Sequence, residues 1–153
     1  MRKAELIAAY AATHYHIHWV EGAFMLRVGE YCPSLAALYA RRGYNSAAFL
    51  TAWNPYSQLA SPAENHAAQQ ALLADLERHD CWIIPGIGLD PAGLWMGEES
   101  FLAIGLGLAD AQRLGRQYRQ NAILWMGEDA VPRLEWLATA SLTSPLTDPA
   151  PDN

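Results

Sequence analysis

The order of elements that the sequence predicts between residues 47 and 125 constrains the fold more than any other feature. The expected elements are a strand at 47–53, a helix at 61–79, strands at 81–87 and 101–105, a helix at 109–118 and a strand at 121–125. This order is typical of the ferredoxin-like split β-α-β arrangement, in which helices cover one face of an antiparallel sheet. The sequence therefore predicts an α+β fold, a two-layer sandwich with a ferredoxin-like core.

The first helix of this series has the clearest start signal in the chain. Ser61 can cap the helix, and Glu64 can reach back to it as in a capping box. The helical spacing predicts that Leu72 and Leu76 are buried and that Gln69 is largely solvated. Capping is also the simplest role for Glu64, without any part in a site.

An N-terminal helix and a β-hairpin are expected to extend or cover this sheet. The first residues favour an amphipathic helix, because their apolar stretch is too short for a signal peptide and is interrupted by a glutamate. Residues 14–28 alternate around a two-residue turn at 21–22, which would place Ile17 opposite Leu26. A short helix at 33–42 follows and should end at the next glycine.

Three histidines lie on the other face of this hairpin and raise the question of a metal site. Alternate strand residues are about 6.6 Å apart, so two imidazoles can share a zinc ion. However, His14, His16 and His18 span too far to close easily on one ion, and the cation Arg27 is expected opposite His16. No cysteine or carboxylate is placed to complete a site, except for Glu21 at the turn. We therefore expect no metal here and place the histidines on the wet side of the hairpin.

The length and composition indicate one domain. The chain has 153 residues, of which 52% are hydrophobic and 17% charged, a globular composition. We expect a single α+β domain over residues 1–138 and a disordered tail over 139–153, which is rich in Pro, Ser and Thr. The sequence allows a last turn of helix at 131–137.

Charge and hydropathy exclude several classes of partner. The net charge is −6 and the only lysine is Lys3, whereas nucleic-acid binding depends on cations that neutralise phosphates. No segment approaches the roughly 20 apolar residues of a membrane span. Cys32 and Cys81 have no metal-ligand spacing and favour reduced thiols. We therefore expect a cytoplasmic protein without nucleic-acid or membrane partners.

Polar side chains concentrate where the predicted core strands begin and end. Pro55 cannot donate to a sheet ladder and restricts Asn54 to an extended conformation, so the strand at 47–53 stops there. Right-handed crossovers would bring this strand end to the same sheet edge as the starts of the two later strands. Polar groups beside aromatic side chains are how small-ligand pockets are built. The ligand-binding residues expected at this edge are Trp53, Asn54, Ser57, Asn65, Glu99, Gln120 and Asn121.

Four short motifs together resemble a bacterial family catalogued as domain of unknown function 3293. The motifs are TAWNPYS at 51–57, EN at 64–65, GEESFLAIGL at 97–106 and RQNAILW at 119–125. The resemblance covers roughly residues 14–135 and supports the domain assignment. It implies no mechanism, because no activity is assigned to that family, and the three histidines lie outside its motifs.

Three classes of function are compatible with these residues. The first is binding of a small polar ligand, a metabolite or nucleotide, at the sheet edge. The second is a protein adapter or regulator that uses an exposed sheet edge or the basic ridge of Arg113, Arg116 and Arg119. The third is an enzyme in which Glu98 or Glu99 acts as general base. Whether the protein is an enzyme and which cofactor it would use are not determined by the sequence.

Two details of the proposed edge have simpler alternatives. Asn54 and Asn121 can serve to satisfy backbone groups at strand ends, as buried amides often do. Glu98 and Glu99 would point to opposite faces of an extended strand, so only one of them could enter a given pocket. On the binding hypothesis, Asn54→Ala and Asn121→Ala should abolish binding and leave the melting temperature nearly unchanged.

Overall fold

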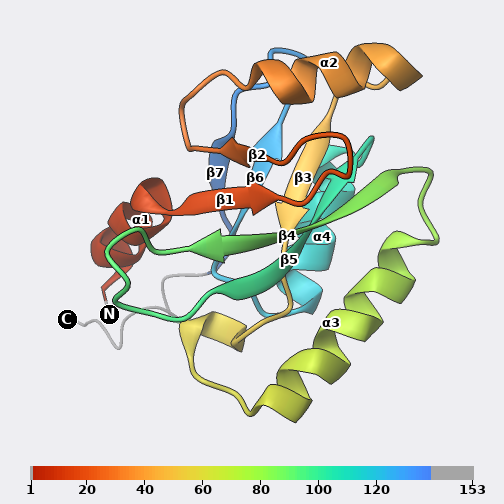
Figure 1. Cartoon of the computed structure of the whole chain (residues 1–153). Coiled ribbons are helices and arrows are strands. Elements are labelled where there is room, and N and C mark those ends of the chain that lie inside the picture. The colour runs from red at the N-terminus through yellow and green to blue at the C-terminus, as the bar shows by residue number, and fades with distance from the viewer. Residues whose placement is uncertain (1, 139–153) are drawn as a thin grey trace.

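A computed structural model describes residues 2–138 of the chain as a mixed α+β fold (Figure 1). Its elements are α1 (Lys3–Ala12), β1 (His14–Ile17), β2 (Phe24–Leu26), α2 (Pro33–Arg42), β3 (Ala47–Leu50), the short helical turn η1 (Pro55–Ser57), α3 (Pro62–Leu76), β4 (Trp82–Leu89), β5 (Glu98–Ile104), α4 (Leu108–Gln117), β6 (Ala122–Met126) and β7 (Arg133–Trp136). Within the described residues the strands form one sheet in the order β2-β1-β4-β5-β3-β6-β7, and neighbouring strands are antiparallel. The α+β class predicted from the sequence is confirmed.

The central strands β4-β5-β3-β6 come from the segment whose element order guided the prediction, but the strand boundaries move, and the end of β3 and the start of β5 move the furthest. β3 ends at Leu50, because the backbone N–H of Ala52 donates to the Gln69 side chain and not to a neighbouring strand. β5 begins at Glu98, three residues before the predicted start, and Glu98 and Glu99 pair with the end of β4. The earlier start of β5 places the two carboxylates within regular strand structure.

Helices cover both faces of the central strands, so the predicted two-layer arrangement is wrong. Ala47 and Phe49 of β3 enter a core that contains residues of α2, whereas Ala48 and Leu50 enter a second core with residues of α3 and α4. All four residues of β3 are buried and apolar, as expected for a strand covered on both faces. Figure 1 shows α2 above the sheet and α3 at the lower right.

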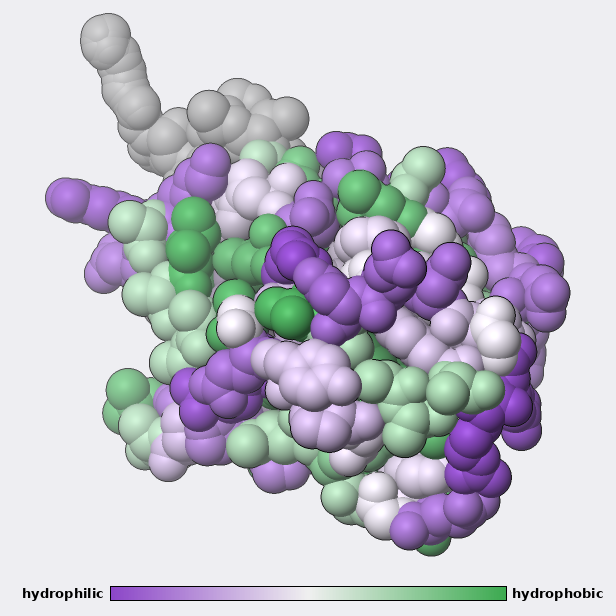
Figure 2. Space-filling view, turned by 90° about the horizontal axis from the view of Figure 1, so that it is seen from above, coloured by the Kyte–Doolittle hydropathy of each residue, from purple (hydrophilic) through white to green (hydrophobic). Residues whose placement is uncertain are grey.

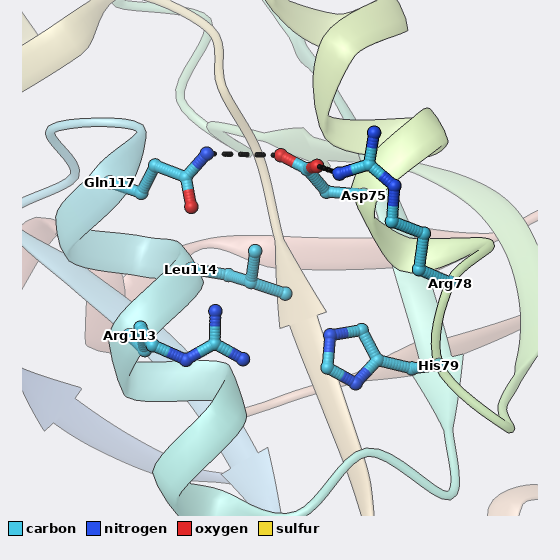
Figure 3. Close-up of a pocket in the computed structure, with 6 residues that line it drawn as sticks. All are labelled: Asp75, Arg78, His79, Arg113, Leu114 and Gln117. Atoms are coloured by element: carbon cyan, nitrogen blue, oxygen red, sulfur yellow. Dashed lines mark hydrogen bonds and ion pairs between the residues drawn. The ribbon is translucent and has the colours of Figure 1, made fainter.

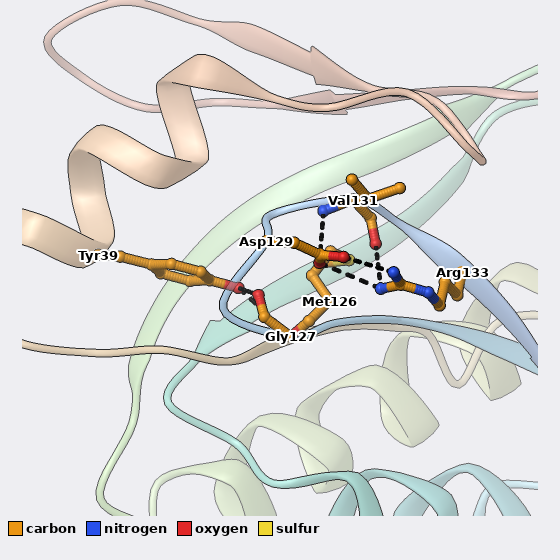
Figure 4. Close-up of polar contacts among 6 residues, drawn as sticks. All are labelled: Tyr39, Met126, Gly127, Asp129, Val131 and Arg133. Atoms are coloured by element: carbon orange, nitrogen blue, oxygen red, sulfur yellow. Dashed lines mark hydrogen bonds and ion pairs between the residues drawn. The ribbon is translucent and has the colours of Figure 1, made fainter.

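The helix predicted at 33–42 is confirmed as α2, and one of its side chains ties it to the sheet. Leu35, Leu38 and Tyr39 are buried, and Gly43 ends the helix with a φ of 74°. The Tyr39 hydroxyl donates to the carbonyl oxygens at the end of β6, at 3.3 Å to Met126 and 3.0 Å to the next residue (Figure 4). Seen from above, hydrophilic side chains surround smaller hydrophobic areas on this side of the molecule (Figure 2).

Removal of the Tyr39 hydroxyl tests this tie between α2 and β6. Tyr39→Phe is expected to lower the free energy of unfolding by about 1 kcal/mol, because the ring still fills its site while two carbonyl groups lose a donor. Urea unfolding at neutral pH measures the change. Tyr31→Phe is the matched control, since the Tyr31 side chain is 59% exposed. Equal stabilities of the two variants would show that the hydroxyl does not hold α2 in place.

The turn between β6 and β7 replaces the helix allowed by the sequence at 131–137. The Asp129 carboxylate accepts from the Val131 N–H at 3.2 Å and from Arg133 at 3.1 Å (Figure 4). The bond from Arg133 holds the pKa of Asp129 below its ordinary value. The chain turns there and returns as β7, with Arg133 opposite Trp125 of β6. That helix prediction is therefore wrong.

The N-terminal hairpin forms, but its register differs from the predicted one by two residues. Ile17 pairs with Phe24 and not with Leu26, because residues 18–23 form a longer connection than the expected two-residue turn. A shift of two residues leaves every side chain on its original face of the sheet. Tyr15, Ile17 and Leu26 are therefore still buried, as predicted.

The sequence also predicted a C-terminal tail, the absence of a membrane span and an N-terminal helix. The predicted disordered tail, 139–153, lies outside the described residues. In the described part, none of the helices has both the length and the apolar character required to cross a bilayer. The helix expected at the N-terminus is present as α1.

Candidate functional site

Side chains from four parts of the chain meet at one edge of the sheet. Asn54 follows β3, Asn65 lies in the first turn of α3, Glu98 opens β5 and Asn121 precedes β6. Ser61 caps α3, and Ser61 and Glu64 form the predicted capping box, which fixes the start of that helix. These elements meet because of the strand order. That any of these residues binds a ligand stays a prediction.

Asn54 and Asn65 hold each other through paired hydrogen bonds. The Asn54 backbone N–H donates to Asn65 Oδ1 at 2.8 Å, and Asn65 Nδ2 donates to Asn54 Oδ1 at 3.0 Å. Asn54 Oδ1 also accepts from the Ala60 N–H at 3.0 Å, which occupies its second lone pair. Asn54 Nδ2 donates to Glu98 Oε2 at 3.3 Å. The two amides therefore build the frame of the site and orient Glu98, and most of their hydrogen-bonding capacity is already used.

The backbone around Asn54 is strained. Asn54, Tyr56, Ser57 and Arg119 have φ values between 46° and 60°, and they are four of the five non-glycine residues with positive φ in residues 2–138. The Tyr56 N–H donates to the Arg119 carbonyl oxygen at 2.7 Å, so the two strained segments are in contact. The extended conformation predicted for Asn54 is wrong, because the paired bonds to Asn65 hold it in the left-handed region. Backbone strain of this kind clusters at functional sites.

Glu98 is the titratable group that this frame presents. Its side chain is half-buried, and burial raises its pKa to about 7, an increase that the bond from Asn54 partly opposes. The negative charge of Glu98 also contributes, after burial, to the raised pKa values of Tyr10 and Tyr15. Glu98 can therefore either donate or accept a proton near neutral pH.

A short chain of polar groups lies in the same place and includes a residue that sequence reasoning missed. Asn121 Nδ2 donates to Ser57 Oγ at 3.1 Å, and the Tyr10 hydroxyl lies 3.4 Å from the same oxygen. Asn121 is 4% exposed, whereas Ser57 is exposed and Tyr10 half-buried. Tyr10 belongs to α1, which is far away in sequence, and no local pattern marked it.

Glu99 points away from this group, as expected for the next residue of a strand. Its carboxylate lies 3.9 Å from His66 Nε2, and the His66 ring packs edge-on against Trp53 with centroids 5.2 Å apart. More than half of the Glu99 side chain is exposed. Glu99 also lines a cavity of about 230 Å³ on the α3 side of the sheet. The predicted site residues therefore fall on two sides of β5.

Gln120 and Gln69 both have internal partners. Gln120 Nε2 donates to the carbonyl oxygens of Trp53 at 3.3 Å and Tyr118 at 3.1 Å, and the residue is 7% exposed. The solvation predicted for Gln69 is wrong, since it is 4% exposed and its Oε1 accepts from Ala52. Gln69 follows Asn65 by four positions, so the helical spacing places the two amides on the same face of α3. That spacing was the available signal for its burial.

The three histidines remain on the face of the hairpin opposite the core. His14 and His16 have ring centroids 6.3 Å apart, and His18 is exposed. Because of the shifted register, His16 pairs with Met25 and not with Arg27. Among residues 2–138, no group of three or more His, Cys, Asp or Glu side chains is arranged to hold a metal ion.

A second cavity, of about 200 Å³, lies between α3 and α4, and three of its lining side chains pair with one another (Figure 3). Asp75 accepts from Arg78 at 2.6 Å and from Gln117 at 3.0 Å. It also accepts from Tyr118, whose pKa is raised to about 12 by burial and by this bond. Arg113, part of the proposed basic ridge, binds Asp110 at 2.8 Å. The bonds from Gln117 and Tyr118 to Asp75 join the two helices, and the bond to Asp110 engages one of the three arginines proposed for an adapter surface.

Comparison with known proteins gives one family. The model of a family described as protein of unknown function (DUF3293) matches residues 50–123, which include Asn54, Asn65, Glu98 and Asn121. The comparisons with curated proteins and with solved structures gave no match. Residues 50–123 therefore match the same family of unknown function, DUF3293, that the four sequence motifs resemble.

Proposed function

We propose that this protein binds a small polar ligand at the sheet edge formed by Glu98, Tyr10, Ser57 and Asn121. The observation that carries the proposal is the half-buried Glu98 carboxyl, held by Asn54 at 3.3 Å, with a pKa of about 7. Perturbed carboxyl groups cluster at functional sites. The strained residues at 54, 56, 57 and 119 support the same location.

The chemistry of these groups favours an uncharged or cationic ligand with hydroxyl or amino groups. Ionised Glu98 accepts hydrogen bonds, protonated Glu98 donates one, and the hydroxyls of Tyr10 and Ser57 can do either. A phosphate or carboxylate would instead be repelled by ionised Glu98. Among metabolites, polyols, amines and nucleosides therefore fit better than nucleotides.

The proposal includes a ferredoxin-like core from β3 to β6. The strand order β4-β5-β3-β6, with α3 between β3 and β4 and α4 between β5 and β6, supports this arrangement. It accounts for the site, because it brings the end of β3 and the starts of β5 and β6 to one edge. The N-terminal hairpin adds β1 and β2 to the sheet beyond β4.

We further propose a cytoplasmic protein whose ligand is not a nucleic acid. Cys32 and Cys81 are free thiols, which suits a reducing compartment. The net charge of −6 opposes binding of a polyphosphate chain.

An enzyme is the second candidate, and the pKa of Glu98 is the observation that favours it. A general base works best when its pKa lies near the operating pH. Glu98 fits this role better than Glu99, whose side chain is more than half exposed. If a bound compound is turned over, Glu98→Gln is expected to abolish turnover and to retain the fold.

Binding can be tested with a panel of polyols, amines and nucleosides by native mass spectrometry and calorimetry. The wild-type protein should retain at least one member, and Tyr10→Phe should weaken its binding about tenfold, the effect of one lost hydrogen bond. Tyr31→Phe, which alters an exposed tyrosine, should bind as the wild type does. The proposal is wrong if no compound binds with a Kd below about 1 mM, or if Tyr10→Phe binds as tightly as the wild type.

A further inference from the structure

The cavity on the α3 side of the sheet is a second place where a small molecule could bind. Its volume is about 230 Å³, and Pro85, Ile87 and Phe101 form an apolar floor. Pro85 pairs with Phe101 across β4 and β5, and Ile87 pairs with Glu99, so these side chains lie in adjacent rows of the sheet. Phe101 packs against the core under α3, which places the cavity on the face opposite Glu98.

Polar groups line this cavity beside its apolar floor. Gln69 of α3 is buried, at 4% exposure. Glu99 is open to solvent, with 57% of its side chain exposed. His18 lines a further side, and its backbone N–H donates to the Pro85 carbonyl oxygen at 2.9 Å, which fixes it beside the floor.

The Gln69 amide has one atom that is unpartnered. Its Oε1 accepts from the Ala52 N–H at 3.0 Å, and this bond determines which end of the amide is oxygen, since a backbone N–H requires an acceptor. The other end, Nε2, is buried and has no hydrogen-bond partner among residues 2–138. A buried donor without an acceptor destabilises the structure, so an acceptor brought by a ligand would bind favourably there.

We propose that this cavity binds a small planar ring that carries an N–H group next to a carbonyl group, the lactam edge found in pyrimidine bases. Gln69 Nε2 donates to the ring carbonyl, and the Glu99 carboxylate accepts from the ring N–H. The apolar face of the ring lies on Pro85, Ile87 and Phe101, a wall of the kind that small-ligand sites present. This site is separate from the one around Glu98 and does not depend on it.

The experiment is a titration of the ¹⁵N-labelled full chain with uracil, followed by NMR. Uracil is expected to shift the Gln69 side-chain amide signals together with the backbone signals of Ile87 and Phe101. The control compound is 1,3-dimethyluracil, which keeps both carbonyl groups but has no N–H, and it should bind at least tenfold more weakly. Uridine distinguishes a free ring from a ring with a sugar attached, and binding of either compound at these residues supports the proposal.

Two variants of the protein complete the test. Glu99→Gln should weaken uracil binding about tenfold, whereas Glu128→Gln, an exposed carboxylate in the turn after β6, should leave it unchanged. Ile87→Trp fills the cavity from a half-exposed position and should abolish binding without loss of the fold. The proposal is wrong if neither uracil nor uridine shifts these signals at about 10 mM, if dimethyluracil binds as tightly as uracil, or if both Glu99→Gln and Ile87→Trp bind like the wild type.

Discussion

Asn54→Ala is expected to lower the free energy of unfolding by about 3 kcal/mol. The change removes the Asn54 side-chain bonds to the Ala60 N–H, to Asn65 and to Glu98, and it leaves a buried Asn65 amide with fewer partners. It also places alanine at a φ of 46°, which costs about 1 kcal/mol more than asparagine or glycine there. Urea unfolding at pH 7 measures the difference. This outcome would replace the expectation from sequence alone that the substitution leaves the melting temperature nearly unchanged.

Asn54→Gly separates the two contributions. Glycine tolerates the left-handed conformation but makes none of the side-chain bonds, so its loss of stability should be smaller than that of alanine by roughly 1 kcal/mol. Equal losses would show that the hydrogen bonds dominate. A loss below about 1 kcal/mol for Asn54→Ala would contradict the structural role of the amide pair, and Asn54 would again be a candidate for direct ligand contact.

The stability of the protein should fall as the pH rises from about 4.5 to 7, because of Glu98. Its pKa is about 7 in the folded protein against an ordinary value of 4.5, so within this window the folded state keeps a proton that the unfolded chain has lost. Stability from this group is complete below pH 4.5 and is lost as the pH passes the folded pKa. The loss is on the order of 2 kcal/mol by pH 8, and thermal unfolding across the pH range measures it.

Glu98→Gln should remove this pH dependence and should be more stable than the wild type at pH 8. The glutamine oxygen can still accept from Asn54 Nδ2, and no charge is buried. Glu99→Gln is the control, because Glu99 is exposed and lies on the other face of β5. This substitution should leave the wild-type pH profile unchanged. A Glu98→Gln profile that falls with pH as steeply as that of the wild type would rule out Glu98 as the group responsible.

Local signals in the sequence were sufficient for the elements that position the site. The pair Ser61 and Glu64 predicts the start of α3, and Gly43 predicts the end of α2, because capping depends on residues only a few positions apart. The approach of Asn54 and Asn121 to one edge followed from the order of strands and helices. These predictions depend on backbone geometry that neighbouring residues determine.

The parts that failed depend on contacts between distant segments. Tyr10 comes to within 3.4 Å of Ser57 across 47 positions of sequence, and nothing near either residue indicates it. The left-handed conformation of Asn54 arises from its bonds to Asn65, which outweigh the preference that Pro55 imposes. The structure has three layers because α2 packs on the face of the sheet opposite α3 and α4. The sequence did not indicate which face α2 would cover.

The alternation of Glu98 and Glu99 makes the length of the connection before β5 a determinant of where the two carboxylates lie. One strand carries two adjacent carboxylates to opposite sides of the sheet, one toward Asn54 and the other toward His66. Insertion or deletion of a single residue that shifted β5 by one position along β4 would exchange the two sides of the strand. The Glu98 side chain would then point away from Asn54, and the Glu99 side chain away from His66. Length changes in residues 90–97 are therefore tolerable only if the register of β5 is preserved, and a side chain at Gly97 is disfavoured as well, because its Cβ would lie 2.7 Å from the side chains of Ile87 and Leu89.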